Sequence, residues 1–94
     1  MSDEPVQPGR LVSSVKGRDS GRFYLVIGSE SSMFIRAADG EGRKVDSPKR
    51  KNVRHLQFYD VLAGEVLEKV RAGKRVTNTD VRKAIKLLVE ALQK

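Results

Sequence analysis

The sequence predicts an α+β fold, in which a small, highly curved β-barrel is followed by a helical hairpin. Short segments of strand-like character follow one another up to residue 58, and beyond residue 60 the spacing of apolar residues becomes helical. The 94 residues are enough for one domain with a modest core. We therefore expect a flexible tail at 1–8, a barrel at 9–59 and a helical extension at 60–94.

Five short strands are expected in the first part of the chain. Residues 11, 13 and 15 alternate with residues 12, 14 and 16 in the manner of a strand with one buried face. Phe23 and Tyr24 fall on opposite faces of the next strand, so one ring can enter the core while the other is exposed. Asp39-Gly40 is a strong hairpin signal, and Ser47-Pro48 interrupts the strand after it. The predicted strands are 10–16, 22–28, 32–37, 43–46 and 52–58, a spacing typical of small barrels.

Two helices are expected after residue 60. Apolar residues at 62, 63, 66, 67 and 70 have helical spacing, and Ala72-Gly73 ends this segment. The second helix starts near Thr77 or Asn78, because Thr77 and Asp80 approximate a capping box. Its apolar face consists of Val81, Ile85, Leu88 and Leu92. We expect the helices to fold back onto the barrel, and pairing with another chain is the alternative.

The composition indicates a basic protein of a reducing compartment. There are 19 Lys and Arg against 12 Asp and Glu, a net charge of +7, which suggests a polyanionic partner but is equally consistent with a solvated basic surface, so the distribution of the charges has to decide. The absence of cysteine excludes disulfides and thiolate metal sites. No apolar run approaches the roughly 20 residues of a membrane span, and the polar, acidic residues 1–5 do not resemble a secretory signal. A cytoplasmic protein without a membrane partner is expected.

The densest cationic segment runs from Arg43 to His55 and contains one acid, Asp46. Pro48 and its polar neighbours are expected to keep this segment out of regular structure and to leave residues 49–51 exposed. Adjacent cations repel one another, and a phosphate backbone would supply the compensating charge. A solvated loop is the alternative. The lone His55 is expected to be a strand residue beside the basic face, where it is a candidate for RNA contact and not a metal ligand. The candidate RNA-binding residues here are Arg43, Lys44, Lys49, Arg50, Lys51, Arg54 and His55.

A second basic patch is the predicted turn between the first two strands. Gly17 and Gly21 bracket it, and glycines expose backbone N–H groups that can bind phosphate oxygens. Asp19 departs from a purely basic loop, and either pairs with a neighbouring arginine or shapes the turn. The alternative is a β-turn that needs glycine for its geometry alone. The candidate RNA-binding residues here are Lys16, Gly17, Arg18, Gly21 and Arg22.

The stretch from Gly9 to Gly28 resembles the KOW motif of ribosomal proteins and transcription elongation factors. It looks most like the KOW segment of archaeal and eukaryotic large-subunit ribosomal proteins, in which a Gly-Arg pair and a Gly-basic pair frame the same loop. Residues 38–40, 43–45, 48–52 and 55–56 extend the similarity to small bacterial KOW-domain RNA-binding proteins. The resemblance covers roughly residues 9 to 58 and implies an SH3-like barrel that binds RNA, often ribosomal RNA, without catalysis.

Together these observations predict a non-catalytic, ribosome-associated RNA-binding protein. The sequence has no Ser/His/Asp arrangement, P-loop or dinucleotide fingerprint, and we expect neither a cofactor nor a metal. RNA, in particular ribosomal RNA, is the expected partner, and ribosomal proteins are further candidates. The alternatives are a protein-interaction module on the ribosome or transcription machinery, or a DNA-binding protein. A monomer is expected, with dimerisation through the C-terminal helices as the alternative.

Overall fold

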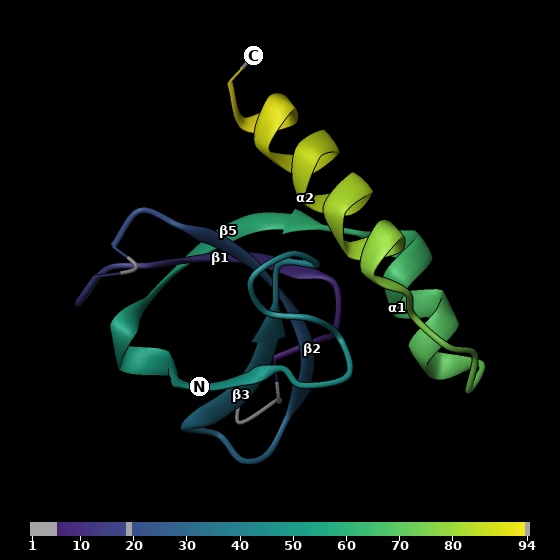
Figure 1. Cartoon of the computed structure of the whole chain (residues 1–94), viewed down its shortest axis with the longest axis horizontal. Helices are drawn as coiled ribbons and strands as arrows, with labels where there is room; N and C mark the ends of the chain where they lie inside the picture. The colour runs from purple at the N-terminus through teal and green to yellow at the C-terminus, as the bar shows by residue number, and fades with distance from the viewer. Residues whose placement is uncertain (1–5, 19, 94) are drawn as a thin grey trace.

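A five-stranded antiparallel sheet followed by two helices makes up the fold (Figure 1). The computed structural model describes residues 6–18 and 20–93, so Asp19 and most of the predicted N-terminal tail lie outside the described residues. A 3-10 turn, η1 (Val53–His55), precedes the last strand. The strands are β1 (Arg10–Ser14), β2 (Phe23–Ser29), β3 (Phe34–Ala38), β4 (Lys49–Asn52) and β5 (Leu56–Leu62), and the helices are α1 (Gly64–Arg71) and α2 (Asn78–Leu92).

The sheet has the strand order β4-β3-β2-β1-β5. Consecutive strands from β1 to β4 are antiparallel neighbours, and β5 returns through η1 to pair with β1. Register shifts between Arg10 and Val12 and between Val26 and Gly28 increase the twist of the strands, as β-bulges do. The sheet therefore curls (Figure 1), and the predicted class, a small barrel-like α+β fold with C-terminal helices, is confirmed.

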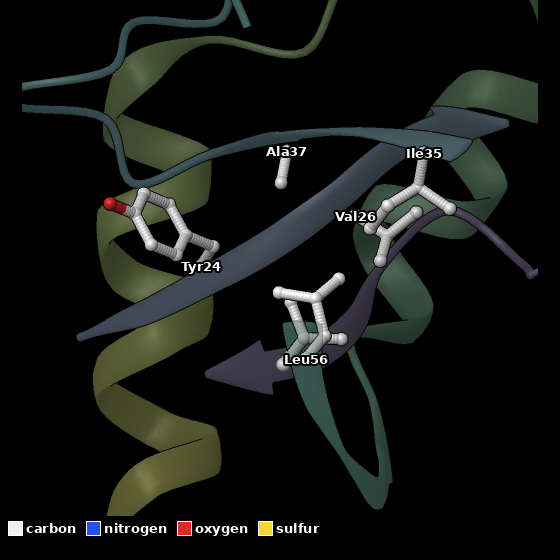
Figure 2. Close-up of a cluster of buried hydrophobic side chains, with 6 residues drawn as sticks. Tyr24, Val26, Ile35, Ala37 and Leu56 are labelled. Carbon is white, nitrogen blue, oxygen red and sulfur yellow. The ribbon is translucent and has the colours of Figure 1, made fainter. Parts of the chain in front are cut away.

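Two apolar cores lie on the two faces of the sheet. Inside the curl, the side chains of Tyr24, Val26, Ile35, Ala37 and Leu56 converge (Figure 2). Tyr24 is 1% exposed whereas Phe23 is half-buried, so Tyr24 is the aromatic residue of that pair that enters this core.

On the other face of the sheet, the helices cover Leu25. Leu25 packs there with Val66 of α1, Val81 of α2 and Val76 from the turn between them. All four are buried. The prediction that the helices fold back onto the barrel is therefore confirmed, and α2 lies against β2.

The predicted start of α2 is confirmed. Thr77 is the N-cap, its hydroxyl accepts a bond from the Asp80 amide, and the Asp80 carboxylate accepts one from the Thr77 amide. These reciprocal bonds satisfy two amide groups that have no partner inside the helix. Lys69 of α1 donates to the same Asp80 carboxylate at 2.7 Å, so the capping box also joins the two helices.

The predicted strand at 43–46 is wrong, because this segment forms turns. The Asp39 carboxylate accepts hydrogen bonds from the amides of Glu41 and Arg43, which keeps the chain turning after β3. The amide of Val45 donates to the Asn78 side chain instead of to a neighbouring strand. The loop is thus held by side chains that compete with strand pairing.

The expectation that residues 49–51 lie outside regular structure is also wrong, since Lys49–Asn52 forms β4. Pro48 precedes this strand and does not need to donate to the sheet. The last strand is shifted from the predicted 52–58 to Leu56–Leu62. The shift arises because the Asn52 side chain accepts a bond from the Arg54 amide and starts η1.

Candidate nucleic-acid interface

A groove of about 480 Å³ brings together two basic segments that are far apart in the sequence. One wall comes from the end of β1 and the β1–β2 loop, and the other from β4 and η1. In the part of the chain that the structure describes, β4 stands at one end of the strand order and pairs with β3. The lining residues are Ser14, Lys16, Gly17, Arg18, Lys49, Arg50, Lys51, Asn52 and His55.

The β1–β2 loop positions the first wall. Gly21 donates to the carbonyl of Ser14 at 2.7 Å and closes the loop. Gly17 has φ +77°, a left-handed conformation that favours glycine, and an added Cβ would meet nothing within 4 Å. The turn conformation itself therefore favours glycine at position 17, as the alternative of a purely structural β-turn predicted. The open space around Gly17 also leaves its backbone accessible. The Val15 amide donates to the His55 carbonyl and ties the loop to η1.

The lysines of β4 reach the groove from the inner face of the curl. Lys51 lies directly opposite Ile35 in the register, and Lys49 lies opposite Ala37. Paired residues share a face of a sheet, and Ile35 and Ala37 belong to the inner core. The Lys51 ammonium lies 4.7 Å from the centre of the buried Tyr24 ring. The apolar stems of these lysines can thus cover the open side of the core while their charged ends reach the groove.

Arg50 lies on the opposite, outer face of β4. Its guanidinium carbon is 3.7 Å from the centre of the Phe34 ring, and its Nε is 3.3 Å from a Glu30 carboxylate oxygen. Arg36 of β3 is its direct cross-strand partner. Arg50 is therefore held in place by contacts within the sheet, although it also borders the groove.

The groove is strongly positive. Five of its lining residues are lysine or arginine, and none of the described lining residues is acidic. A concave surface of one charge sign raises the local concentration of ligands of the opposite sign. Phosphate groups carry the opposite charge and are among the ligands that such a surface can attract.

Comparison with known proteins identifies the family of this chain. No family model matches the chain. A protein of Bacillus subtilis (strain 168) named "Putative ribosome-binding protein YbzG" is 43% identical over 62 residues, which are 66% of this chain and 84% of that protein. The chain belongs to the family of this protein. Most of the relative's length is therefore represented here.

Seven of the twelve predicted RNA-binding residues line the groove, namely Lys16, Gly17, Arg18, Lys49, Arg50, Lys51 and His55. The other five, Gly21, Arg22, Arg43, Lys44 and Arg54, do not line it. Arg22 instead borders a separate hollow whose lining holds both acids, Asp39 and Glu41, and further cations, Arg82 and Lys86. Arg43 and Lys44 lie in the turns after β3, and Arg54 is exposed on η1. For all twelve residues, those in the groove included, RNA contact stays a prediction.

The structure also shows participants that were not singled out from the sequence. Ser14 and Asn52 line the groove between its cations. Glu30, Phe34 and Arg36 gather around Arg50 on the outer face of the β3–β4 hairpin. These three residues could have been found from the register between β3 and β4. That register can be predicted only if the position of β4 is known.

Two other kinds of feature are absent from the described residues, a metal site and a membrane-spanning helix. Residues 6–18 and 20–93 contain no group of three His, Cys, Asp or Glu side chains that could hold a metal ion. Neither of the two helices described has the length and apolar character needed to cross a membrane.

Proposed function

We propose that this chain is a non-catalytic RNA-binding protein that associates with the ribosome and uses the basic groove to bind ribosomal RNA. The observation that carries the proposal is the convergence of Lys16 and Arg18 with Lys49, Arg50 and Lys51 in a groove without a described acid. A concave surface that gathers cations attracts a polyanion. An RNA backbone is such a polyanion and releases its own counterions on binding.

Two lines of similarity support the proposal. The Bacillus subtilis relative carries a name that includes ribosome binding. The resemblance of Gly9–Gly28 to the KOW motif implies the same class of partner, and the hairpin of β1 and β2 occupies that stretch. A ribosomal partner also implies a cytoplasmic location.

In the proposed complex, the backbone of a single RNA segment follows the groove. Lys16 and Arg18 contact phosphates from one wall, and Lys49 and Lys51 contact them from the other. The unhindered backbone at Gly17 allows close approach. The exposed His55 at the end of the groove can add a hydrogen bond to phosphate or stack on a base.

Sedimentation of cell extract on sucrose gradients at low and high salt tests this function. We expect the full chain to migrate with the large ribosomal subunit at low salt and to leave it at high salt. The double variant Lys49→Gln/Lys51→Gln should migrate with the subunit less, whereas Arg71→Gln/Lys74→Gln, with the same loss of charge away from the groove, should behave as wild type. Sedimentation as free protein at every salt concentration would refute the proposal.

A second candidate function, protein binding, is favoured by the surface between the helices. A hollow of about 210 Å³ lies there, lined mainly by apolar groups of Ala63, Val66, Ala84 and Leu88. Leu87 borders it and is 65% exposed. Binding to intact large subunits but not to protein-free ribosomal RNA, with loss of binding in Leu87→Gln, would favour this candidate. Preference for duplex DNA in competition with structured RNA would instead indicate a DNA-binding protein.

A further inference from the structure

Arg50 is fixed in an unusual position for a phosphate-binding arginine. One face of its guanidinium lies against the Phe34 ring, with the guanidinium carbon 3.7 Å from the ring centre. Its Nε edge faces the Glu30 carboxylate at 3.3 Å. The side chain nevertheless remains 58% exposed. A planar group is thus held against an aromatic ring while more than half of its side chain stays accessible.

This geometry suits a nucleobase better than a phosphate. A phosphate would have to compete with Glu30 for the Nε edge, and the carboxylate already offsets part of the charge. A base needs only a flat surface, and arginine planes are surfaces on which unpaired RNA bases stack. Because Phe34 and Glu30 hold the plane in advance, little side-chain entropy is lost when a base binds.

The neighbouring residues also favour a ligand at this place. Arg36 lies directly opposite Arg50 on the same outer face, and like charges in such pairs destabilise a sheet. The guanidinium of Arg36 is laid over Gly28, whose missing side chain leaves room for it. Arg36 is exposed and can take the phosphate of a nucleotide whose base stacks on Arg50.

Strand β4 therefore has two different faces. Lys49 and Lys51 project from the inner face toward the groove, while Arg50 projects from the outer face onto Phe34. We propose that Arg50, supported by Phe34 and held by Glu30, is a stacking platform for an unpaired base, so that this protein selects looped or single-stranded RNA over continuous duplex. The inference rests on the proposed RNA-binding function. In a duplex the bases are stacked inside the helix and cannot reach the platform.

Fluorescence-anisotropy titrations with three synthetic RNAs test the inference. The probes are a hairpin with a single-stranded loop, a fully paired duplex of equal charge, and the same hairpin with abasic loop positions. We expect wild-type protein to prefer the first hairpin. Arg50→Lys keeps the charge but removes the plane, so it should lose on the order of tenfold in affinity for that hairpin and change little for the duplex and the abasic hairpin.

Phe34→Leu provides a second variant, because it removes the support while leaving Arg50 in place. It should reproduce the selective loss seen with Arg50→Lys. The matched control Arg71→Lys makes the same exchange on α1 and should bind all three probes as wild type does.

The outcomes separate the inference from the function on which it rests. Equal wild-type affinity for the three probes, or an Arg50→Lys variant that binds the looped hairpin as well as wild type does, would overturn the stacking platform while leaving RNA binding intact. Wild-type protein that binds none of the probes at low salt would overturn both.

Discussion

The Lys69 ammonium lies 2.7 Å from a carboxylate oxygen of Asp80, and this contact links the two C-terminal helices. The same carboxylate accepts the Thr77 amide in the capping box of α2. Asp80 thus caps the N-terminus of α2 and also holds α1 against α2. The hydrogen bond from Lys69 is the main cause that lowers the pKa of Asp80 below its ordinary value of 3.8, and the bond from the Thr77 amide acts in the same direction.

The lowered pKa predicts how stability depends on pH. A carboxylate with a lower pKa in the folded than in the unfolded protein stabilises the fold fully above the unfolded value. That contribution is lost as the pH falls from the ordinary value of Asp80 through its lowered folded value. Asp80→Asn should therefore unfold more easily than wild type at neutral pH, and the difference should shrink in acid.

Urea unfolding of both proteins across this pH range measures the difference. Other carboxylates titrate in both proteins, so the difference in unfolding free energy isolates Asp80. Lys69→Met should lower the stability at neutral pH in the same way. A difference between wild type and Asp80→Asn that stays constant down to strong acid would show that the Asp80 charge does not contribute.

Loss of the N-cap hydroxyl should destabilise α2 and with it the packing on β2. Thr77→Ala removes the acceptor for the Asp80 amide and should cost about 1 kcal/mol of unfolding free energy. The hydroxyl of the neighbouring Thr79 accepts a bond from the exposed Arg82 side chain and takes no part in the capping box. Thr79→Ala is therefore a matched control. Thermal unfolding followed by circular dichroism compares the two, and equal effects would contradict a specific capping role.

Gly40 joins the loop after β3 to α2 and should not tolerate a side chain. Its φ is +82°, and an added Cβ would lie 2.6 Å from the Asn78 carbonyl oxygen. Gly40→Ala should therefore lower the unfolding free energy by more than the roughly 1–2 kcal/mol expected for an alanine in the left-handed conformation, because the backbone at Asn78 must also move. Gly17→Ala has the same conformational cost but free space around the new methyl group. Chemical unfolding should rank Gly40→Ala as the more destabilised variant, and the reverse order would contradict the close approach.

The first hairpin and α2 could be predicted because their signals are local. The alternation of residues 11–16 and the capping box at Thr77 are fixed by neighbours in the sequence, and β1, β2 and α2 lie close to their predicted positions. Strand β4 has no such signal. Its inner face carries Lys49 and Lys51 over the core in place of apolar residues, so the expected alternation is missing.

The candidate site was predictable only in part for the same reason. The cations themselves are visible in the sequence, but their grouping depends on the β1–β2 loop meeting η1 through the bond between Val15 and His55. The stacking of Arg50 on Phe34 depends on the register of an unpredicted strand. Long-range pairing of this kind is set by the whole sheet and not by neighbouring residues.

The lysines of β4 should contribute to the salt dependence of RNA binding. Each phosphate contact on single-stranded RNA contributes about 0.7 to the slope of log affinity against log salt concentration, so Lys49→Gln/Lys51→Gln should flatten the slope by about 1.4. Charge on an edge strand also discourages pairing with other chains, and that role alone would leave the slope unchanged. Arg71→Gln/Lys74→Gln controls for net charge. Titrations of a looped hairpin RNA at several salt concentrations measure the slopes, and equal slopes for wild type and the β4 variant would exclude these lysines from the interface.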